Sequence, residues 1–250
     1  MKKRNNFYRD KVVYKPWGYE YVVYSNSNRL AITFLKINYG HKTSLHCHPK
    51  KKTGFIILSG KALVQIGIYK ENSKTYGSLS RLVFRPGLFH SIKSKSKQGV
   101  CALEFETPFK KNDLVRFKDD YGRQAKLYEG KKFTKTIESN FIKFKKPKLG
   151  KKQKYNFNNL EILLEVRKNL KNLVRKDDMT TSAILDGKIV DNNGQNVISY
   201  GEIVKTSTLR ILSDVFKIRK PLTILRVSKK NMNSTKTKNM KKFKLKILLI

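Results

Sequence analysis

Short apolar runs separated by turn residues dominate the first half of the chain. Several of these runs alternate apolar and polar positions, as a strand with one buried face does. Strands are predicted at 19–24, 30–37, 55–60, 62–67 and 101–106. The pattern therefore indicates a mainly β domain built from successive antiparallel strands.

The pattern changes after Gly130. Residues 130–155 are rich in Lys and show little regular periodicity, which suggests a linker or an arm. From Asn159 to Lys176 the apolar residues follow a helical spacing with one apolar stripe, so a helix is predicted there. Asp186-Gly187 is a strong hairpin signal between two strand-like pieces. The strands predicted in this half are 181–185, 188–190, 195–200, 202–207 and 222–227.

All four histidines lie in two short segments: His41, His46 and His48 in one, and His90 in the other. Alternate side chains of a strand share a face, so His46 and His48 point the same way. Pro86-Gly87 is a turn signal that would deliver His90 at the start of the next strand. Two imidazoles from one strand and a third from elsewhere make a three-His set, which suits Zn, Fe, Mn or Ni and leaves positions open for water or substrate.

An isolated His-x-His pair is more often structural or on the surface. Here the concentration of all the histidines beside turn residues favours a metal site. His41 follows Gly40 directly and fits a loop residue better than a ligand. The predicted ligands are His46, His48 and His90, and the predicted cofactor is a divalent metal ion of unassigned identity.

Three ordered motifs carry a resemblance to a family. Gly40-x5-His46-x-His48 followed by Pro86-x3-His90 resembles the two motifs of the cupin superfamily, a double-stranded β-helix or jelly-roll-like barrel. Lys15-Pro16-Trp17-Gly18-Tyr19-Glu20 looks like the opening of the cupin domain of type II mannose-6-phosphate isomerases, the C-terminal domain of the bifunctional mannose-1-phosphate guanylyltransferase/mannose-6-phosphate isomerase. Residues 112–123 are similar to the closing segment of the same domain. The resemblance covers residues from about 15 to 124.

The resemblance also implies an altered site. The family binds its metal with a Gln, a His, a Glu and a second-motif His. By spacing, His46 stands where the Gln would be, while His48 and His90 match the two histidines. Thr53 stands where the Glu would be, and a Thr hydroxyl is a poor metal ligand. Thr53 therefore becomes a candidate for substrate binding.

Lys51 and Glu104 are further candidates for chemistry. Lys51 lies in a lysine triplet beside the His pair and could hold a phosphate, although such a triplet is equally often a solvated loop. Glu104 shares a strand face with Glu106 and could act as acid or base on a sugar carbon. The periodicity does not decide whether that face points inward or toward surface lysines.

Arg123 lies in the closing segment of the resemblance. It matches an arginine tied to catalysis in the family, which implies a contact to a phosphate or to the transition state. A salt bridge to Asp119 or Asp120 is the alternative.

The formal charge of +38 does not by itself indicate that the protein binds nucleic acid. Only 12 of the 56 basic residues are Arg, and the Lys excess is spread along the chain. Nucleic-acid binders favour Arg for bidentate contacts, so a compositional bias explains the charge better than nucleic-acid binding. A basic surface would still attract an anionic sugar phosphate.

Two cysteines, Cys47 and Cys101, make no disulfide framework and suit a reducing cytoplasm. The N-terminus shows no signal peptide, and no apolar stretch is long enough for a membrane span.

The sequence predicts five segments. They are a basic lead-in (1–14), a cupin domain (15–128), a basic linker (129–155), a second and smaller α+β unit (156–228), and a basic, disordered tail (229–250). The second unit echoes the strand rhythm of a cupin half, so it is predicted to be a degenerate cupin-like domain that serves as lid, dimer interface or scaffold. A homodimer is one option that the sequence leaves open.

Two functions follow from these predictions. The first is a metal-dependent isomerase or epimerase that acts on a sugar phosphate or nucleotide sugar in polysaccharide precursor synthesis, most similar to mannose-6-phosphate isomerase. In it Lys51, Glu104 and Arg123 would be catalytic, and Lys51, Thr53 and Arg123 would contact the substrate. The second is a non-catalytic sugar-binding or regulatory cupin module, which the Thr53 departure motivates.

Overall fold

The structure is a computed structural model that describes residues 7–126, 128–170, 173 and 180–230. The predicted tail lies almost wholly outside these residues, as do part of the predicted lead-in and part of the helix predicted at 159–176. The chain divides into two compact units, residues 1–137 and 138–250. No helix in the described part of the chain is long and apolar enough to cross a membrane.

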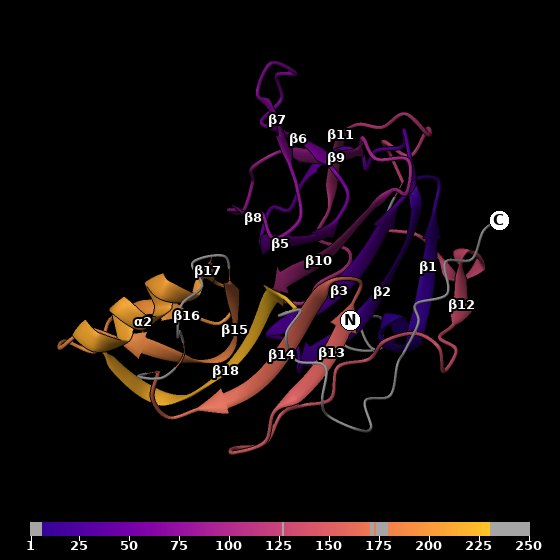
Figure 1. The fold of residues 1–250 in the computed structure, drawn as a ribbon. Helices are drawn as coiled ribbons and strands as arrows, with labels where there is room; N and C mark the ends of the chain where they lie inside the picture. Colours follow the sequence, from indigo (N-terminus) through magenta and orange to yellow (C-terminus); the bar gives the residue numbers. More distant parts are fainter. Residues whose placement is uncertain (1–6, 127, 171–172, 174–179, 231–250) are drawn as a thin grey trace. The chain divides into compact units, whose positions relative to one another are not determined.

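The first unit contains two antiparallel sheets, which Figure 1 shows in indigo to magenta. The seven-stranded sheet has the order β12 (Thr134–Thr136), β1 (Lys11–Lys15), β2 (Gly18–Asn26), β3 (Leu30–Ile37), β10 (Val100–Thr107), β5 (Lys52–Ser59) and β8 (Arg81–Phe84). The five-stranded sheet has the order β11 (Val115–Lys118), β4 (Leu45–Cys47), β9 (His90–Ser94), β6 (Ala62–Ile66) and β7 (Ser73–Tyr76). Two 3-10 turns, η1 (Tyr8–Asp10) and η2 (Lys131–Phe133), complete this unit.

The chain passes repeatedly from one sheet to the other, and their inner faces form one core. Leu35 and Phe55 of the larger sheet pack in one buried cluster with Val64 and Ile92 of the smaller sheet. The mainly β fold and the strands predicted in this half are confirmed. Crossing between two antiparallel sheets that share a core is the arrangement of a jelly-roll barrel.

Strand β10 shows whether Glu104 and Glu106 point into the barrel or toward the surface, which the sequence periodicity did not decide. All of its residues except the last are buried, so neither face is marked by exposure. Ala102 belongs to the core cluster between the two sheets. Because Glu104 and Glu106 share its face, both carboxylates point into the barrel.

The first unit extends beyond the predicted domain limits at both ends. Lys11–Lys15, most of which falls in the predicted lead-in, forms strand β1. Thr134–Thr136, inside the predicted linker, pairs with it in the register Lys11 with Thr136 and Val13 with Thr134. The structure therefore divides the chain near residue 137 and not at residue 128.

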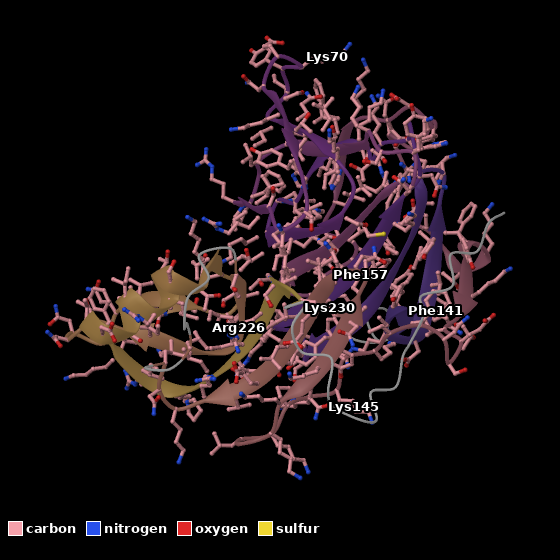
Figure 2. The ribbon with its side chains drawn as sticks, viewed as in Figure 1. Lys70, Phe141, Lys145, Phe157, Arg226 and Lys230 are labelled. Carbon is pink, nitrogen blue, oxygen red and sulfur yellow. The ribbon has the colours of Figure 1, made fainter. Side chains whose placement is uncertain are left out.

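The second unit is one antiparallel sheet with a single described α-helix. The strand order is β13 (Gln153–Phe157), β14 (Leu160–Arg167), β18 (Lys217–Lys229), β15 (Thr181–Val190) and β16 (Asn196–Ser199), and β17 (Ile203–Lys205) pairs with β15. Helix α2 (Thr206–Val215) places Leu209 against Ile184, Leu222 and Ile224 of the sheet. Arg226 of β18, labelled in Figure 2, pairs with Glu165 of β14 at 2.9 Å. The cupin-like origin of this unit stays a prediction.

The helix predicted from Asn159 to Lys176 is wrong over its first half, where the chain forms β14. This strand lies between β13 and β18, and it buries Leu160, Ile162 and Leu164 on one face and Leu163 on the other. A strand buried on both faces loses its alternation, because apolar residues then occupy both sets of positions. Its apolar residues can therefore fit a helical spacing by chance.

The hairpin predicted at Asp186-Gly187 is also wrong, because both residues lie inside the continuous strand β15. Gly187 has a φ of +82° and marks an irregularity, since the pairing register with β18 shifts on both sides of Asp186. A Cβ at Gly187 would lie 2.6 Å from the carbonyl oxygen of Pro221. The glycine therefore permits a bulge and a close backbone approach.

Candidate metal centre

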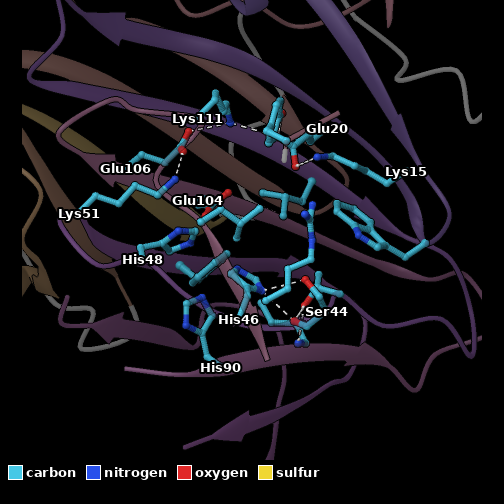
Figure 3. Close-up of a pocket in the computed structure, with 18 of the residues that line it drawn as sticks. Lys15, Glu20, Ser44, His46, His48, Lys51, His90, Glu104, Glu106 and Lys111 are labelled. Carbon is cyan, nitrogen blue, oxygen red and sulfur yellow. Dashed lines mark hydrogen bonds and ion pairs between the residues drawn. The ribbon is translucent and has the colours of Figure 1, made fainter. Parts of the chain in front are cut away.

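The three predicted ligands converge inside the first unit. His46 lies on β4, His48 follows that strand directly, and His90 begins β9, where it pairs with His46 across the ladder. One ring nitrogen of each histidine lies within 4.8 Å of the corresponding nitrogens of the other two. Figure 3 shows the three rings gathered at one end of a pocket.

Each imidazole is fixed by a hydrogen bond from its Nδ1 to a backbone carbonyl. His46 bonds to Ser44 at 2.8 Å, His48 to Asp113 at 2.6 Å and His90 to Leu88 at 3.0 Å. A carbonyl can only accept, so each Nδ1 carries the proton and each Nε2 keeps its lone pair. The Nε2 atoms of His48 and His90 are buried and have no hydrogen-bond partner in the described part of the chain.

Burial keeps these imidazoles neutral. It lowers the pKa of His46 well below the usual 6.5, and the neighbouring His90 lowers it further. It also lowers the pKa of His48 well below 6.5, and the charge of Lys51 adds to this effect. Burial also lowers the pKa of His90 to about 4. Neutral imidazole is the form that binds a metal ion. Three oriented Nε2 lone pairs, two of them on buried atoms without a partner, therefore fit a divalent ion.

His41 does not join this group. It is exposed, and its Nδ1 lies 3.1 Å from the Tyr121 hydroxyl. Its interpretation as a loop residue agrees with this position.

Thr53 lies on β5 with its side chain fully buried. Its hydroxyl has no hydrogen-bond partner among the described residues, and it lies opposite Glu106 on the neighbouring strand. Thr53 therefore provides no carboxylate that could serve as a metal ligand. Its predicted contact with a substrate stays a prediction.

Glu104 lines the pocket between the histidines and the charged wall described next (Figure 3). Burial, together with the neighbouring charge of Glu106, raises the pKa of Glu104 to about 7. A carboxyl with this pKa can both take up and release a proton near neutrality.

A row of buried ion pairs forms the wall opposite the histidines (Figure 3). Lys51 lies 2.6 Å from Glu106, Lys111 bridges Glu106 at 2.8 Å and Glu20 at 3.1 Å, and Lys15 lies 3.6 Å from Glu20. We call these five residues the charged wall. Cations and carboxylates alternate along it, so every charge has an opposite neighbour.

The ion pairs set the protonation of the charged wall. Burial alone would raise the pKa of Glu20, but Lys111 and Lys15 outweigh it and lower that pKa to about 2. The same balance, with Lys111 and Lys51, holds the pKa of Glu106 far below its usual range. Glu106 therefore stays ionised beside a Glu104 that titrates near neutrality, and this separates the roles of the two carboxyls.

The predicted phosphate contacts are both present in the pocket and both paired. Lys51 is the only buried member of the lysine triplet. Arg123 lines the pocket, and its guanidinium lies 2.6 Å from Asp119 and 2.8 Å from Glu129. The salt bridge to Asp119 that the sequence offered as an alternative is thus formed. Arg123 therefore both lines the pocket and forms the salt bridge.

Sequence reasoning missed four members of the site: Lys15, Glu20, Lys111 and Tyr128. Tyr128 donates a hydrogen bond to Glu20. Lys15 and Glu20 lie in the opening motif, whose pattern indicates the family resemblance but no role for either side chain. Their alternation on β1 and β2 gave no indication that Glu20 meets Lys111, which lies 91 positions further along the chain.

The barrel and its three-His centre define the class of the first unit as a cupin domain. Residues 2–119 match a family model described as "Mannose-6-phosphate isomerase C-terminal", which confirms the resemblance seen in the motifs. This part of the chain is therefore similar to the cupin-type domain of that family.

Several solved structures are similar to part of the chain. A conserved protein from Klebsiella pneumoniae with a double-stranded β-helix domain is 16% identical, with a TM-score of 0.36 over 40% of this chain and 79% of that one. A putative sugar phosphate isomerase from Acidithiobacillus ferrooxidans is 17% identical, with a TM-score of 0.32 over 37% and 62%. The capsular polysaccharide assembling protein CapF from Staphylococcus aureus is 15% identical, with a TM-score of 0.38 over 43% and 34%. A search of curated proteins found no match.

Proposed function

We propose that the first unit is a metal-dependent isomerase of a sugar phosphate, of the mannose-6-phosphate isomerase kind. The observation that carries the proposal is the set of three fixed imidazoles that converge in the pocket that Glu104 also lines. His46, His48 and His90 would hold the ion. A bound divalent ion polarises a carbonyl and the hydroxyl on the neighbouring carbon.

In this proposal Glu104 moves the proton. Its carboxylate takes the proton from the carbon next to the aldehyde carbonyl, which leaves an enediolate, and returns it to the former carbonyl carbon. The proton of the neighbouring hydroxyl passes to the former carbonyl oxygen, so that the hydroxyl carbon becomes the new carbonyl. A ketose phosphate results, and the same carboxyl ends the cycle ready for another. A pKa of about 7 suits both halves of this transfer.

Lys51 and Arg123 are the proposed phosphate contacts. An ammonium has three donors, and Lys51 spends one on Glu106. The guanidinium of Arg123 has five donors, and three of them are used by Asp119 and Glu129. Both cations therefore have donors left to bind a phosphate without breaking these pairs.

The test is turnover of mannose 6-phosphate by the purified protein, first stripped of metal and then supplied with Zn, Mn, Fe, Ni or Co. Turnover with at least one metal is expected, with loss of activity in His48→Ala and in Glu104→Gln. Absence of turnover on this and on related sugar phosphates with every metal would contradict the proposal. The proposal also places the reaction in the cytoplasm, in the synthesis of polysaccharide precursors.

A sugar-binding module without catalysis is the second candidate. Thr53 favours it, because the resemblance places a carboxylate ligand at that position. In this case a sugar phosphate should bind the metal-free and the metal-loaded protein equally well, and Thr53→Glu should increase metal affinity. Equal binding together with absent turnover would select this candidate.

A further inference from the structure

Asp113 touches both halves of the pocket, although its own side chain is not among those that line it. Its backbone carbonyl accepts the Nδ1 proton of His48 at 2.6 Å. Its carboxylate accepts the backbone N–H groups of Lys50 at 2.9 Å and Lys51 at 2.8 Å. One residue thus contacts a metal-binding imidazole and the segment that starts the charged wall.

The burial and pairing of Asp113 make these contacts rigid. The residue is 6% exposed, and its own N–H closes a turn onto the carbonyl of Lys110 at 3.2 Å. Directly after it, β11 pairs with β4 in the register Val115 with Cys47 and Arg116 with His46. The segment is therefore held along the strand that carries the first ligand.

The loop from His48 to Lys51 has no regular structure that would fix it. Its anchors are the two N–H groups on the Asp113 carboxylate, and the N–H of Gly87, which donates to the carbonyl of His48 at 2.9 Å. Removing the carboxylate would leave two N–H groups without their acceptor. The loop could then move, and His48 would lose its alignment with the Asp113 carbonyl.

We infer that Asp113 is a positioning residue that sets the tautomer of His48 and the place of Lys51 before any ion or substrate binds. It does so through the pair of contacts on its carboxylate, which hold the loop against the carbonyl that orients the ring. The inference rests on the proposed metal centre and concerns a residue outside it. Outer-shell partners of this kind change metal affinity by about 10- to 100-fold when removed.

Three variants separate position from charge. Asp113→Asn keeps an acceptor oxygen in place and loses the charge, Asp113→Glu keeps the charge and moves the carboxylate, and Asp113→Ala removes both. Asp120→Ala is the matched control. It deletes a carboxylate from the same segment, and among the described residues that carboxylate forms an ion pair only with Lys42, at 3.0 Å on the surface.

The first readout is the tautomer of each histidine in the metal-free protein, from nitrogen-15 NMR of the rings. Wild type, Asp113→Asn and Asp120→Ala are expected to show His48 with the proton on Nδ1, and Asp113→Glu and Asp113→Ala to show a mixture. His46 and His90, whose acceptors are Ser44 and Leu88, serve as internal controls and should not change.

The second readout is the dissociation constant for Co²⁺, followed through its visible absorption. Asp113→Glu and Asp113→Ala should bind at least about tenfold more weakly than the control. A His48 protonated on Nε2 in wild type would overturn the inference without any variant. So would unchanged tautomers and affinities in a folded Asp113→Glu. If wild type binds no Co²⁺, the proposed function fails, and the tautomer comparison alone decides the role of Asp113.

Discussion

The ring of Phe84 lies flat against the ring of His90, with 4.2 Å between centroids and 12° between planes. Phe84 is buried in the core cluster and contacts Phe55, which in turn lies edge-on to His90. The third imidazole is therefore held by aromatic packing as well as by its bond to Leu88.

Phe84→Ala should destabilise the protein by about 3–5 kcal/mol, because it removes a buried ring and leaves a cavity. Phe84→Leu should cost less and still release one face of the His90 ring. We expect both variants to bind Zn²⁺ more weakly than wild type in a calorimetric titration. Unchanged affinity in a folded Phe84→Leu would show that the hydrogen bond alone orients the ring.

The loss of stability on removing one charge from the charged wall should depend on which residue is replaced. Glu106→Gln leaves two buried ammonium groups, those of Lys51 and Lys111, without their common partner. Lys51→Met leaves Glu106 still paired with Lys111. Loss of a buried partner costs about 3–5 kcal/mol, so Glu106→Gln should be the more destabilised of the two in urea denaturation. The reverse order would mean that the Lys51 pair dominates.

The contribution of Glu104 to the stability of the metal-free protein should fall as pH rises toward neutrality. The three imidazoles contribute in the opposite direction, because their lowered pKa values make stability rise with pH up to about 6.5. The pKa of Glu104 is about 7 in the folded protein and 4.5 as the ordinary value, so between these values the folded state binds more protons than the unfolded state. The contribution of Glu104 is therefore fully present below about 4.5 and lost as pH rises past 7. Glu104→Gln should remove this dependence, which urea denaturation at pH 5 and pH 8 can measure. A parallel pH dependence in the variant and wild type would rule out the raised pKa.

Two glycines of the second unit offer a matched pair. Gly187 and Gly194 have nearly the same positive φ, +82° and +80°. A Cβ at Gly187 would meet the Pro221 carbonyl oxygen at 2.6 Å, whereas one at Gly194 would meet only the Arg219 side chain, at 3.4 Å. Both Ala variants carry the backbone strain, so the larger drop in melting temperature expected for Gly187→Ala reports the clash. Equal drops would contradict the bulge.

Local patterns were enough to predict much of the first unit. Leu30–Ile37 was predicted as a strand with the same bounds as β3, and the convergence of His46, His48 and His90 followed from strand alternation and one turn. Both depend only on neighbouring residues. The family motifs added the cupin fold.

What the sequence could not predict depends on contacts between distant residues. Lys111 meets Glu20 across 91 positions, and Asp113 meets His48 across 65, and neither has a local signature. In the second unit, burial on both faces of Leu160–Arg167 removed the alternation that marks a strand. The glycine at 187 resembled a turn because positive φ serves bulges as well as hairpins.

The acceptors that orient His46 and His90 are main-chain oxygens of Ser44 and Leu88. Most amino-acid replacements at positions 44 and 88 would keep those oxygens in place. Position 44, which lines the pocket, can therefore diversify through mutation while the imidazoles keep their orientation, so that new ligand preferences could arise without loss of the metal centre.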